Sequence, residues 1–90
     1  MQTLPARKTI GFRFKAPEAQ SVALVGSFNN WDARRNPMWK DSDGIWKILI
    51  SMPEGRNEYE FWVDGHEVAD PNSRDCALSP SGAKCSVMEV

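Results

Sequence analysis

The stretch Gly26-Ser27-Phe28-Asn29-Asn30-Trp31 interrupts a chain that otherwise alternates apolar and polar residues. Residues 21–25, immediately before it, have a period of two and predict a β-strand whose Val22 and Leu24 side chains point inward. Residues 29–38, which overlap its end, are polar and rich in turn-forming residues, and they predict a long surface connection. Because surface connections often carry function, this stretch is the first candidate for a functional segment.

The same period-two alternation recurs along the chain and predicts further strands. They cover residues 9–15, 45–50, 58–63 and 86–90. Asp43-Gly44 and Asp64-Gly65 are typical of tight hairpin turns, and the proline- and glycine-containing segment 70–82 is expected to be a loop. No window shows convincing helical spacing. The sequence therefore predicts an all-β fold, an antiparallel sandwich of five or six main strands.

The alternation also predicts which side chains form the core. The inward positions are apolar or aromatic: Ile10, Phe12, Phe14, Trp46, Ile48, Ile50, Tyr59, Phe61 and Val63. On the strand at 58–63, the same phase places Glu58, Glu60 and Trp62 on the outer face. An outward Trp62 either offers a flat platform to a ligand or packs across the strand face, and the pattern leaves both open.

Length and composition describe an ordinary globular domain. Ninety residues suffice for one core, and 41% hydrophobic with 26% charged residues argues against disorder and membrane residence. The eleven basic and twelve acidic residues form no run that would follow a nucleic-acid backbone. Residues 1–8 lack the apolar stretch of a signal peptide, so a cytoplasmic protein without nucleic-acid or membrane partners is expected. We assign 1–8 to an N-terminal arm and 9–90 to the sandwich.

Few residues suit catalysis or metal binding. The single histidine, His66, lies beside a hairpin turn and cannot form a histidine cluster. Cys76 and Cys85 lack metal-type spacing and are expected to be free thiols, with a structural disulfide as the alternative. We therefore expect a protein that is not an enzyme and has no catalytic residues, metal or cofactor.

Six ordered motifs carry a family resemblance. They are residues 26–31, Asn36-Pro37-Met38, Asp43-Gly44-Ile45-Trp46, Met52-Pro53-Glu54-Gly55, residues 59–65 and Asp70-Pro71. In this order they resemble the early-set carbohydrate-binding module family. That family includes the N-terminal modules of isoamylases and branching enzymes, stand-alone bacterial isoamylase early-set domain proteins, and the glycogen-binding domain of AMP-activated kinase β subunits. The resemblance covers about residues 9–90 and implies an immunoglobulin-like (early-set) β-sandwich. It also implies a non-catalytic module that binds α-glucans such as glycogen or starch, with a glycogen-metabolising enzyme as a candidate partner.

The resemblance also implies a binding site. The tryptophan that ends the family's first motif stacks on glucan, and Trp31 matches it. A flat aromatic ring covers the apolar face of a sugar ring, while polar groups bind the hydroxyls at its rim. Glu60 stands where the family has a basic residue, and Glu67 stands where it has a second stacking tryptophan. The predicted carbohydrate-binding residues are Trp31, Trp62, Glu60, Asn30, Ser81 and Lys84.

Three further side chains lie in or near the first motif and its connection, Phe28, Asn29 and Trp39. Phe28 is expected to cap the core, and Asn29 to bond the turn backbone. Trp39 is either an additional platform or an isolated exposed aromatic residue.

Because Glu60 and Glu67 differ from the family's pattern, the alternative function is a degenerate sandwich. Such a sandwich would act as a protein-interaction or regulatory module of glycogen metabolism without binding sugar.

Overall fold

The computed structural model describes residues 6–90, which form eight strands and one short 3-10 helix. The strands are β1 (Arg7–Lys15), β2 (Val22–Gly26), β3 (Trp39–Lys40), β4 (Ile45–Pro53), β5 (Arg56–Val63), β6 (His66–Val68), β7 (Cys76–Leu78) and β8 (Lys84–Glu89). The helix, η1, covers Ser27–Asn29. All strand pairs are antiparallel within the described residues, and the predicted all-β class is confirmed.

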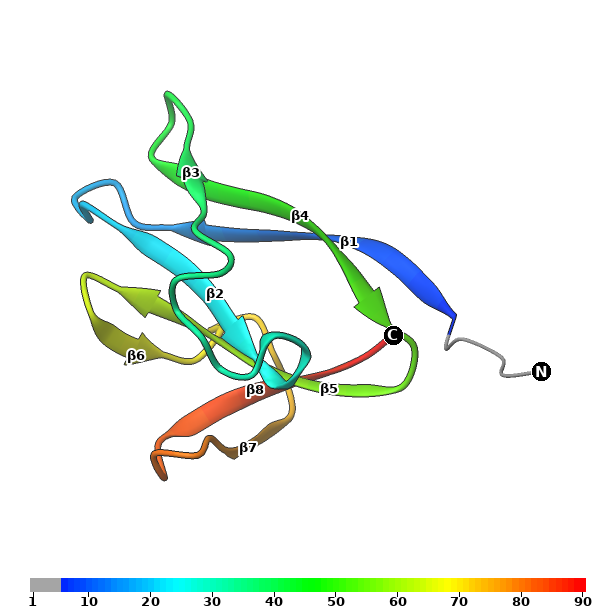
Figure 1. Ribbon diagram of the computed structural model, residues 1–90. Coiled ribbons are helices and arrows are strands. Elements are labelled where there is room, and N and C mark those ends of the chain that lie inside the picture. Colours follow the sequence, from blue (N-terminus) through cyan, green and yellow to red (C-terminus); the bar gives the residue numbers. More distant parts are fainter. Residues whose placement is uncertain (1–5) are drawn as a thin grey trace.

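The strands make two sheets that face each other. One has three strands in the order β1-β4-β3, and the other has five, in the order β2-β5-β8-β7 with β6 beside β5. Figure 1 shows them as two layers, with β1 and β4 in one and β2, β5 and β8 in the other. This arrangement is the antiparallel sandwich that the alternation predicts, and it agrees with the immunoglobulin-like type that the family resemblance implies.

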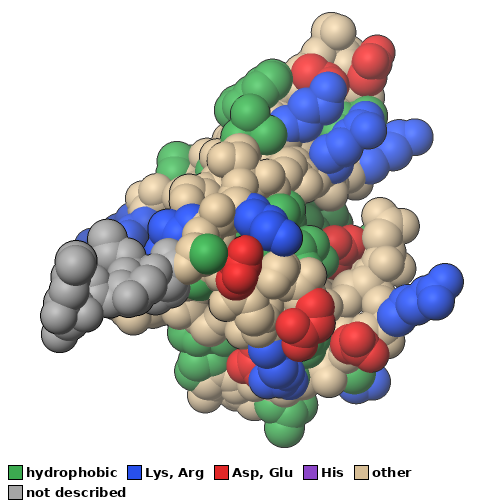
Figure 2. All heavy atoms as spheres, turned by 90° about the vertical axis from the view of Figure 1, so that its right-hand side faces the viewer, with side chains coloured by type: hydrophobic (Ala, Val, Ile, Leu, Met, Phe, Trp, Pro, Cys, Tyr) green, Lys and Arg blue, Asp and Glu red, His purple; other side chains and the backbone are tan. Residues whose placement is uncertain are grey.

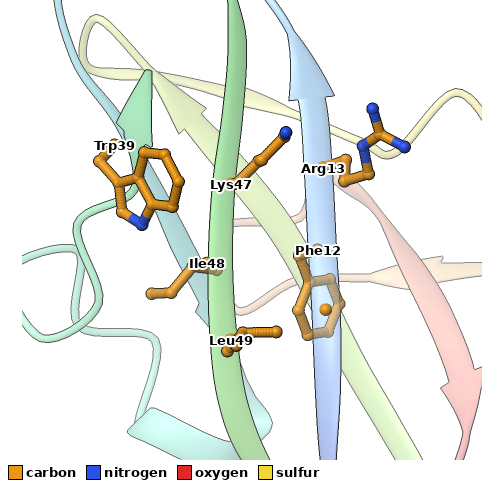
Figure 3. A pocket seen from close by; sticks show the side chains of 7 residues that line it. Phe12, Arg13, Trp39, Lys47, Ile48 and Leu49 are labelled. Carbon is orange, nitrogen blue, oxygen red and sulfur yellow. The ribbon is translucent and has the colours of Figure 1, made fainter. Parts of the chain in front are cut away.

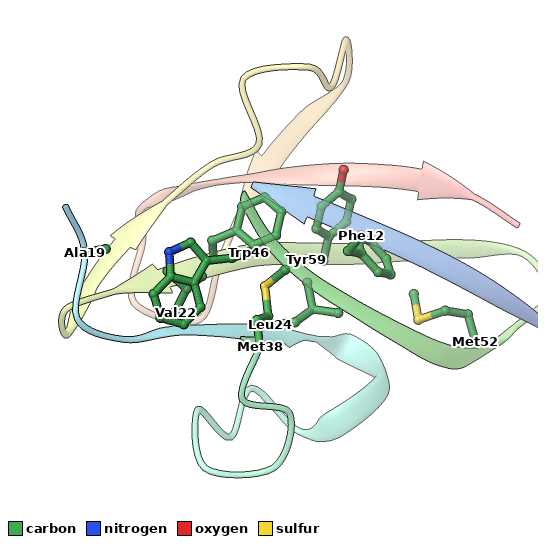
Figure 4. Close-up of a cluster of buried hydrophobic side chains, with 9 residues drawn as sticks. Phe12, Ala19, Val22, Leu24, Met38, Trp46, Met52 and Tyr59 are labelled. Carbon is green, nitrogen blue, oxygen red and sulfur yellow. The ribbon is translucent and has the colours of Figure 1, made fainter. Parts of the chain in front are cut away.

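The core lies between the two sheets (Figure 4). Its buried members at predicted inward positions are Phe12, Val22, Leu24, Trp46, Tyr59 and Phe61, and its buried members that were not predicted are Ala19, Met38 and Met52. The other predicted inward residues on β1, β4 and β5 are partly buried against this cluster. The rings of Phe12 and Tyr59 meet edge to face with centroids 5.1 Å apart, which joins β1 to β5 across the sandwich. Trp46 is 7% exposed, and its indole N–H donates to the carbonyl of Ala16 at 2.9 Å. The predicted core role of Trp46 is therefore confirmed.

Three short strands were missed by sequence reasoning. β3, β6 and β7 have two or three residues each, too few for alternation to be recognised. β7 lies inside segment 70–82, so the prediction of a continuous loop there was wrong. It is a strand because its backbone pairs with β8, a relation that no local pattern encodes.

Two further segments differ from their predicted boundaries. The predicted surface connection 29–38 begins and ends on buried side chains, Asn29 and Met38. Its backbone is bonded to β2, because the Met38 N–H donates to the Val22 carbonyl at 2.8 Å. β1 begins at Arg7, so the last two residues assigned to the N-terminal arm pair with β4. Residues 1–5 of that arm lie outside the described residues.

The two cysteines are free thiols, as expected. Cys76 pairs with Ser86, and Ala77 pairs with Cys85, so the cysteines are one residue out of register on neighbouring strands. Successive side chains in a strand point to opposite faces, so Cys76 and Cys85 lie on opposite faces of their sheet. Cys76 is exposed, while Cys85 is buried.

Asp64-Gly65 forms the tight hairpin that its sequence predicts. Both residues have positive φ, 50° and 83°, as a two-residue turn between right-twisted strands requires. The Asp64 carboxylate also accepts the N–H groups of Gln20 and Ser21, at 2.9 and 2.8 Å. The part of the chain that the structure describes holds no helix with the length and hydropathy of a membrane-spanning segment.

Tyr59→Phe should lower the free energy of unfolding by about 2 kcal/mol, the usual contribution of a hydrogen bond to a charged group. The Tyr59 hydroxyl donates to an oxygen of Asp70 at 2.6 Å. Burial and the neighbouring Asp70 carboxylate raise the pKa of Tyr59 well above its usual value, so the hydroxyl stays a donor. Urea unfolding at pH 7 measures the loss. Asp70→Asn, which keeps an acceptor oxygen, should cost less, and an unchanged Tyr59→Phe midpoint contradicts the assigned bond.

Candidate functional site

The outer face of the five-stranded sheet gathers three of the six candidate residues, Glu60, Trp62 and Ser81. Val25 on β2 lies opposite Glu60 on β5, and Ala23 lies opposite Trp62. On the other side of β5, Trp62 pairs with Glu67 of β6. Directly paired residues share a face, so Glu60, Trp62 and Glu67 form one outward cluster.

Glu60 points to the outer face, as predicted, yet only 2% of it is exposed to solvent. Its Oε2 atom is buried and makes no hydrogen bond within residues 6–90. Burial, and then the neighbouring Glu67 carboxylate, raise the pKa of Glu60 to about 7, while the Trp62 side chain opposes the rise. The period-two alternation predicted the correct face for Glu60 but did not predict that its side chain is buried. A ligand touches Glu60 only if its neighbours move.

Glu67 is the polar centre of the cluster. One carboxylate oxygen accepts hydrogen bonds from the Ser81 hydroxyl at 2.8 Å and from the Ser79 hydroxyl at 3.1 Å. The two hydroxyl oxygens are 2.9 Å apart, so either hydroxyl can donate its single proton to the other in place of Glu67. Ser79 is buried, whereas Ser81 is exposed, so the network reaches from under the surface to solvent. Sequence reasoning treated Glu67 only as a replaced tryptophan and had no local signal for this role.

Asn29 organises the loop that carries Trp31. Its side-chain oxygen accepts the Gly26 N–H at 3.0 Å, and its amide donates to the Leu24 carbonyl at 3.0 Å and to the Asn36 side chain at 2.7 Å. The predicted role of Asn29 in bonding the turn backbone is therefore confirmed. Phe28 packs against the core from the same loop, also as predicted.

Asn30 and Trp31 have left-handed backbones, with φ of 57° and 56°. Left-handed geometry costs a residue with a side chain roughly 1–2 kcal/mol, and for a bulky residue it is unusual. The Trp31 N–H donates to the Gly26 carbonyl at 3.0 Å, which fixes this geometry. Trp31 is half-buried and Asn30 is exposed.

The predicted site residues thus fall into three positions. Glu60, Trp62 and Ser81 surround Glu67. Trp31 and Asn30 share the loop whose base, Gly26, lies opposite Tyr59. Trp62 is three residues beyond Tyr59 on β5, so about 10 Å of strand separates Trp62 from the base of this loop at the usual rise per residue. Lys84 is exposed at the start of β8, opposite Leu78. Among residues 6–90, no group of three or more His, Cys, Asp or Glu side chains is placed to hold a metal ion.

An antiparallel sandwich with a tryptophan-bearing loop and an outward polar cluster defines a small all-β binding module. The chain belongs to the carbohydrate-binding module 48 (isoamylase N-terminal domain) family, whose model matches residues 2–81. The family resemblance of the sequence motifs is therefore confirmed, and with it a carbohydrate-binding class of module.

Curated relatives of this chain include bacterial 1,4-alpha-glucan branching enzymes. GlgB 2 of Xanthomonas campestris is 40% identical over 85 residues, which cover 89% of this chain and 11% of that enzyme. GlgB of Rhodopseudomonas palustris is 34% identical over 89 residues, covering 92% of this chain and 12% of the enzyme. GlgB of Prochlorococcus marinus is 37% identical over 70 residues, covering 72% and 9%. The chain thus spans about a tenth of the length of these relatives.

Proposed function

We propose that this chain is a non-catalytic module that binds α-glucan of the glycogen or starch type on the outer face of the five-stranded sheet. The family is one of carbohydrate-binding modules, and the relatives are named as 1,4-alpha-glucan branching enzymes. Its binding would hold a glycogen-metabolising enzyme partner close to the polymer. A cytoplasmic location stays a prediction.

The observation that carries this proposal is the strained backbone at Trp31. Two consecutive left-handed residues persist only because the loop's hydrogen bonds hold them, and such strain is concentrated at functional sites. Strain that fixes an indole suits a stacking platform, because a sugar ring needs a rigid flat surface in a defined orientation. Ser81 and Asn30, both exposed, supply polar groups for the sugar hydroxyls.

The affinity should be weak because such a platform buries little area. A dissociation constant on the order of micromolar to millimolar is expected. Maltoheptaose titration followed by NMR tests the proposal, because each of the four tryptophans has its own indole N–H signal. Signals of Trp31 and Trp62 should shift. Trp46 is an internal control, since its indole N–H is buried and bonded to the Ala16 carbonyl.

Trp31→Ala should weaken maltoheptaose binding at this face by about tenfold or more, a loss of about 1.4 kcal/mol. The readout is the Trp62 indole shift, compared with Trp31→Phe, which keeps an aromatic face and should retain part of the affinity. Circular dichroism checks that both variants keep the fold. Equal Trp62 titration curves for wild type and Trp31→Ala would contradict the proposal.

The second candidate function is a sandwich that binds protein rather than sugar. It is favoured by one observation, the carboxyl pair of buried Glu60 and half-buried Glu67 at the centre of the proposed face. Maltoheptaose or β-cyclodextrin that leaves every tryptophan signal unmoved would support this function over glucan binding.

A further inference from the structure

The most exposed of the four tryptophans lies on the opposite sheet. Trp39, on β3, is 59% exposed, whereas Trp31 and Trp62 are half-buried and Trp46 is buried. Trp39 pairs with Lys47 of β4, which places both side chains on the outer face of the three-stranded sheet. An exposed indole on a sheet face offers a rigid flat surface on which the apolar face of a ligand can stack.

Trp39 forms one side of a hollow of about 670 Å³ on this face (Figure 3). Leu49, 77% exposed, lies opposite Gly11 and supplies apolar surface. A Cβ atom at Gly11 would stand 3.4 Å from the nearest Leu49 methyl, so a side chain at this position would enter the hollow. The volume is within the range of sites that hold small molecules, and Gly11 keeps the site open.

The polar groups at the rim are donors. Arg13 lies opposite Lys47, and both line the hollow. The Lys47 ammonium is 2.8 Å from the Asp41 carboxylate, so its charge is already compensated. Figure 2 shows Lys and Arg side chains gathered in the upper part of the molecule, with hydrophobic side chains beside them. A flat apolar wall with guanidinium and ammonium N–H groups at its edge matches a neutral ring with an apolar face and a hydroxyl rim.

We propose that the outer face of the three-stranded sheet is a second α-glucan platform, with Trp39 stacking on a sugar ring and Arg13 and Lys47 donating to its hydroxyls. The ligand class rests on the proposed function, but the residues and the sheet are different. The two platforms lie on opposite outer faces of the sandwich, so one molecule holds two glucan segments.

The indole signals separate the two platforms in one maltoheptaose titration. In the Trp31→Ala protein, the Trp39 signal should still shift. Trp39→Ala should leave the Trp31 and Trp62 responses intact and lower the number of bound oligosaccharides seen by calorimetry from two to one. Gly11→Val, an unstrained change in an extended strand, should fill the hollow and weaken the Trp39 response by about tenfold. Thr9→Ala, one position further along the same face of β1, is the matched control and should change nothing.

A Trp39 signal that stays unmoved at about 10 mM maltoheptaose, roughly tenfold above the weakest useful affinity, overturns the second platform. If Trp31 and Trp62 respond in that experiment, the proposed function survives alone. If only Trp39 responds, the second platform stands and the face of the five-stranded sheet is not the sugar site. A salt-sensitive Trp39 shift with an acidic peptide, and none with maltoheptaose, identifies a protein partner and also overturns the inference.

Discussion

Glu60→Gln should make the protein more stable by about 3 kcal/mol at pH 8 and leave its stability nearly unchanged at pH 4. Glu60 is 2% exposed, and its pKa is raised from 4.5 to about 7, first by burial and then by the Glu67 carboxylate. Above pH 7 the folded protein therefore holds a buried charge whose Oε2 atom makes no hydrogen bond within residues 6–90. A glutamine keeps the shape, carries no charge and can donate an N–H to Glu67.

The direction in which stability changes with pH follows from the direction of the Glu60 pKa change. An acid whose pKa is higher in the folded state binds its proton more tightly there than in the unfolded chain. Wild-type stability should be greatest below about pH 4.5 with respect to this group, fall between pH 4.5 and 7, and level off above pH 7. Asp41 titrates outside this window, because the Lys47 ammonium and then the backbone N–H groups that bond the carboxylate lower its pKa to about 2.

Urea unfolding at pH 4, 6 and 8 measures this dependence for the wild type and the variant. Glu67→Gln is the matched control. It removes only the second cause of the shift and should flatten the profile less than Glu60→Gln does. Parallel pH profiles for wild type and Glu60→Gln would show that the Glu60 carboxyl is solvated in solution.

Glu60 also shows which structural properties the period-two alternation can predict. The period of two gave its face correctly, because side-chain direction in a strand is local. Its burial depends on Val25 from β2, Glu67 from β6 and the strands beside them, which meet only in the folded sheet. The same reason explains the missed strands: β3 and β7 exist because β4 and β8 offer backbone partners, and two or three residues have no pattern of their own.

The loop at Asn29 was predictable because its hydrogen bonds, unlike the pairing of β3 and β7, are local in sequence. An asparagine after a strand can bond the backbone within a few residues, so both the donor and the acceptors are near in sequence. Trp31 was identified as a site residue by resemblance alone. Its left-handed backbone, which gives a physical reason for that role, results from bonds between the loop and β2 that the sequence does not display. In the sequence, Trp39 looked like an isolated aromatic residue. The hollow beside it is also lined by Gly11 of β1, and β1 and β3 lie in one sheet only because each pairs with β4.

Asn29→Ala should lower the free energy of unfolding by about 4 kcal/mol, because two buried backbone groups lose their partner at about 2 kcal/mol each. These groups are the Gly26 N–H and the Leu24 carbonyl, both in buried positions at the end of β2. The bond to Asn36 is lost as well, so the loop is released from its own far end. Without that tie, Trp31 should relax from its left-handed conformation, which the free chain does not favour.

Two variants separate the causes. Asn36→Ala removes only the 2.7 Å side-chain bond and should cost about 1 kcal/mol. Asn29→Asp keeps the acceptor for Gly26 but turns an oxygen toward the Leu24 carbonyl, so it should be nearly as damaging as alanine at pH 7. Urea unfolding ranks the three, and the Trp62 response to maltoheptaose, recorded at a temperature where Asn29→Ala stays folded, reports on the platform. If Asn29→Ala is destabilised as expected but binds maltoheptaose like the wild type, the strained geometry of Trp31 has no part in sugar binding.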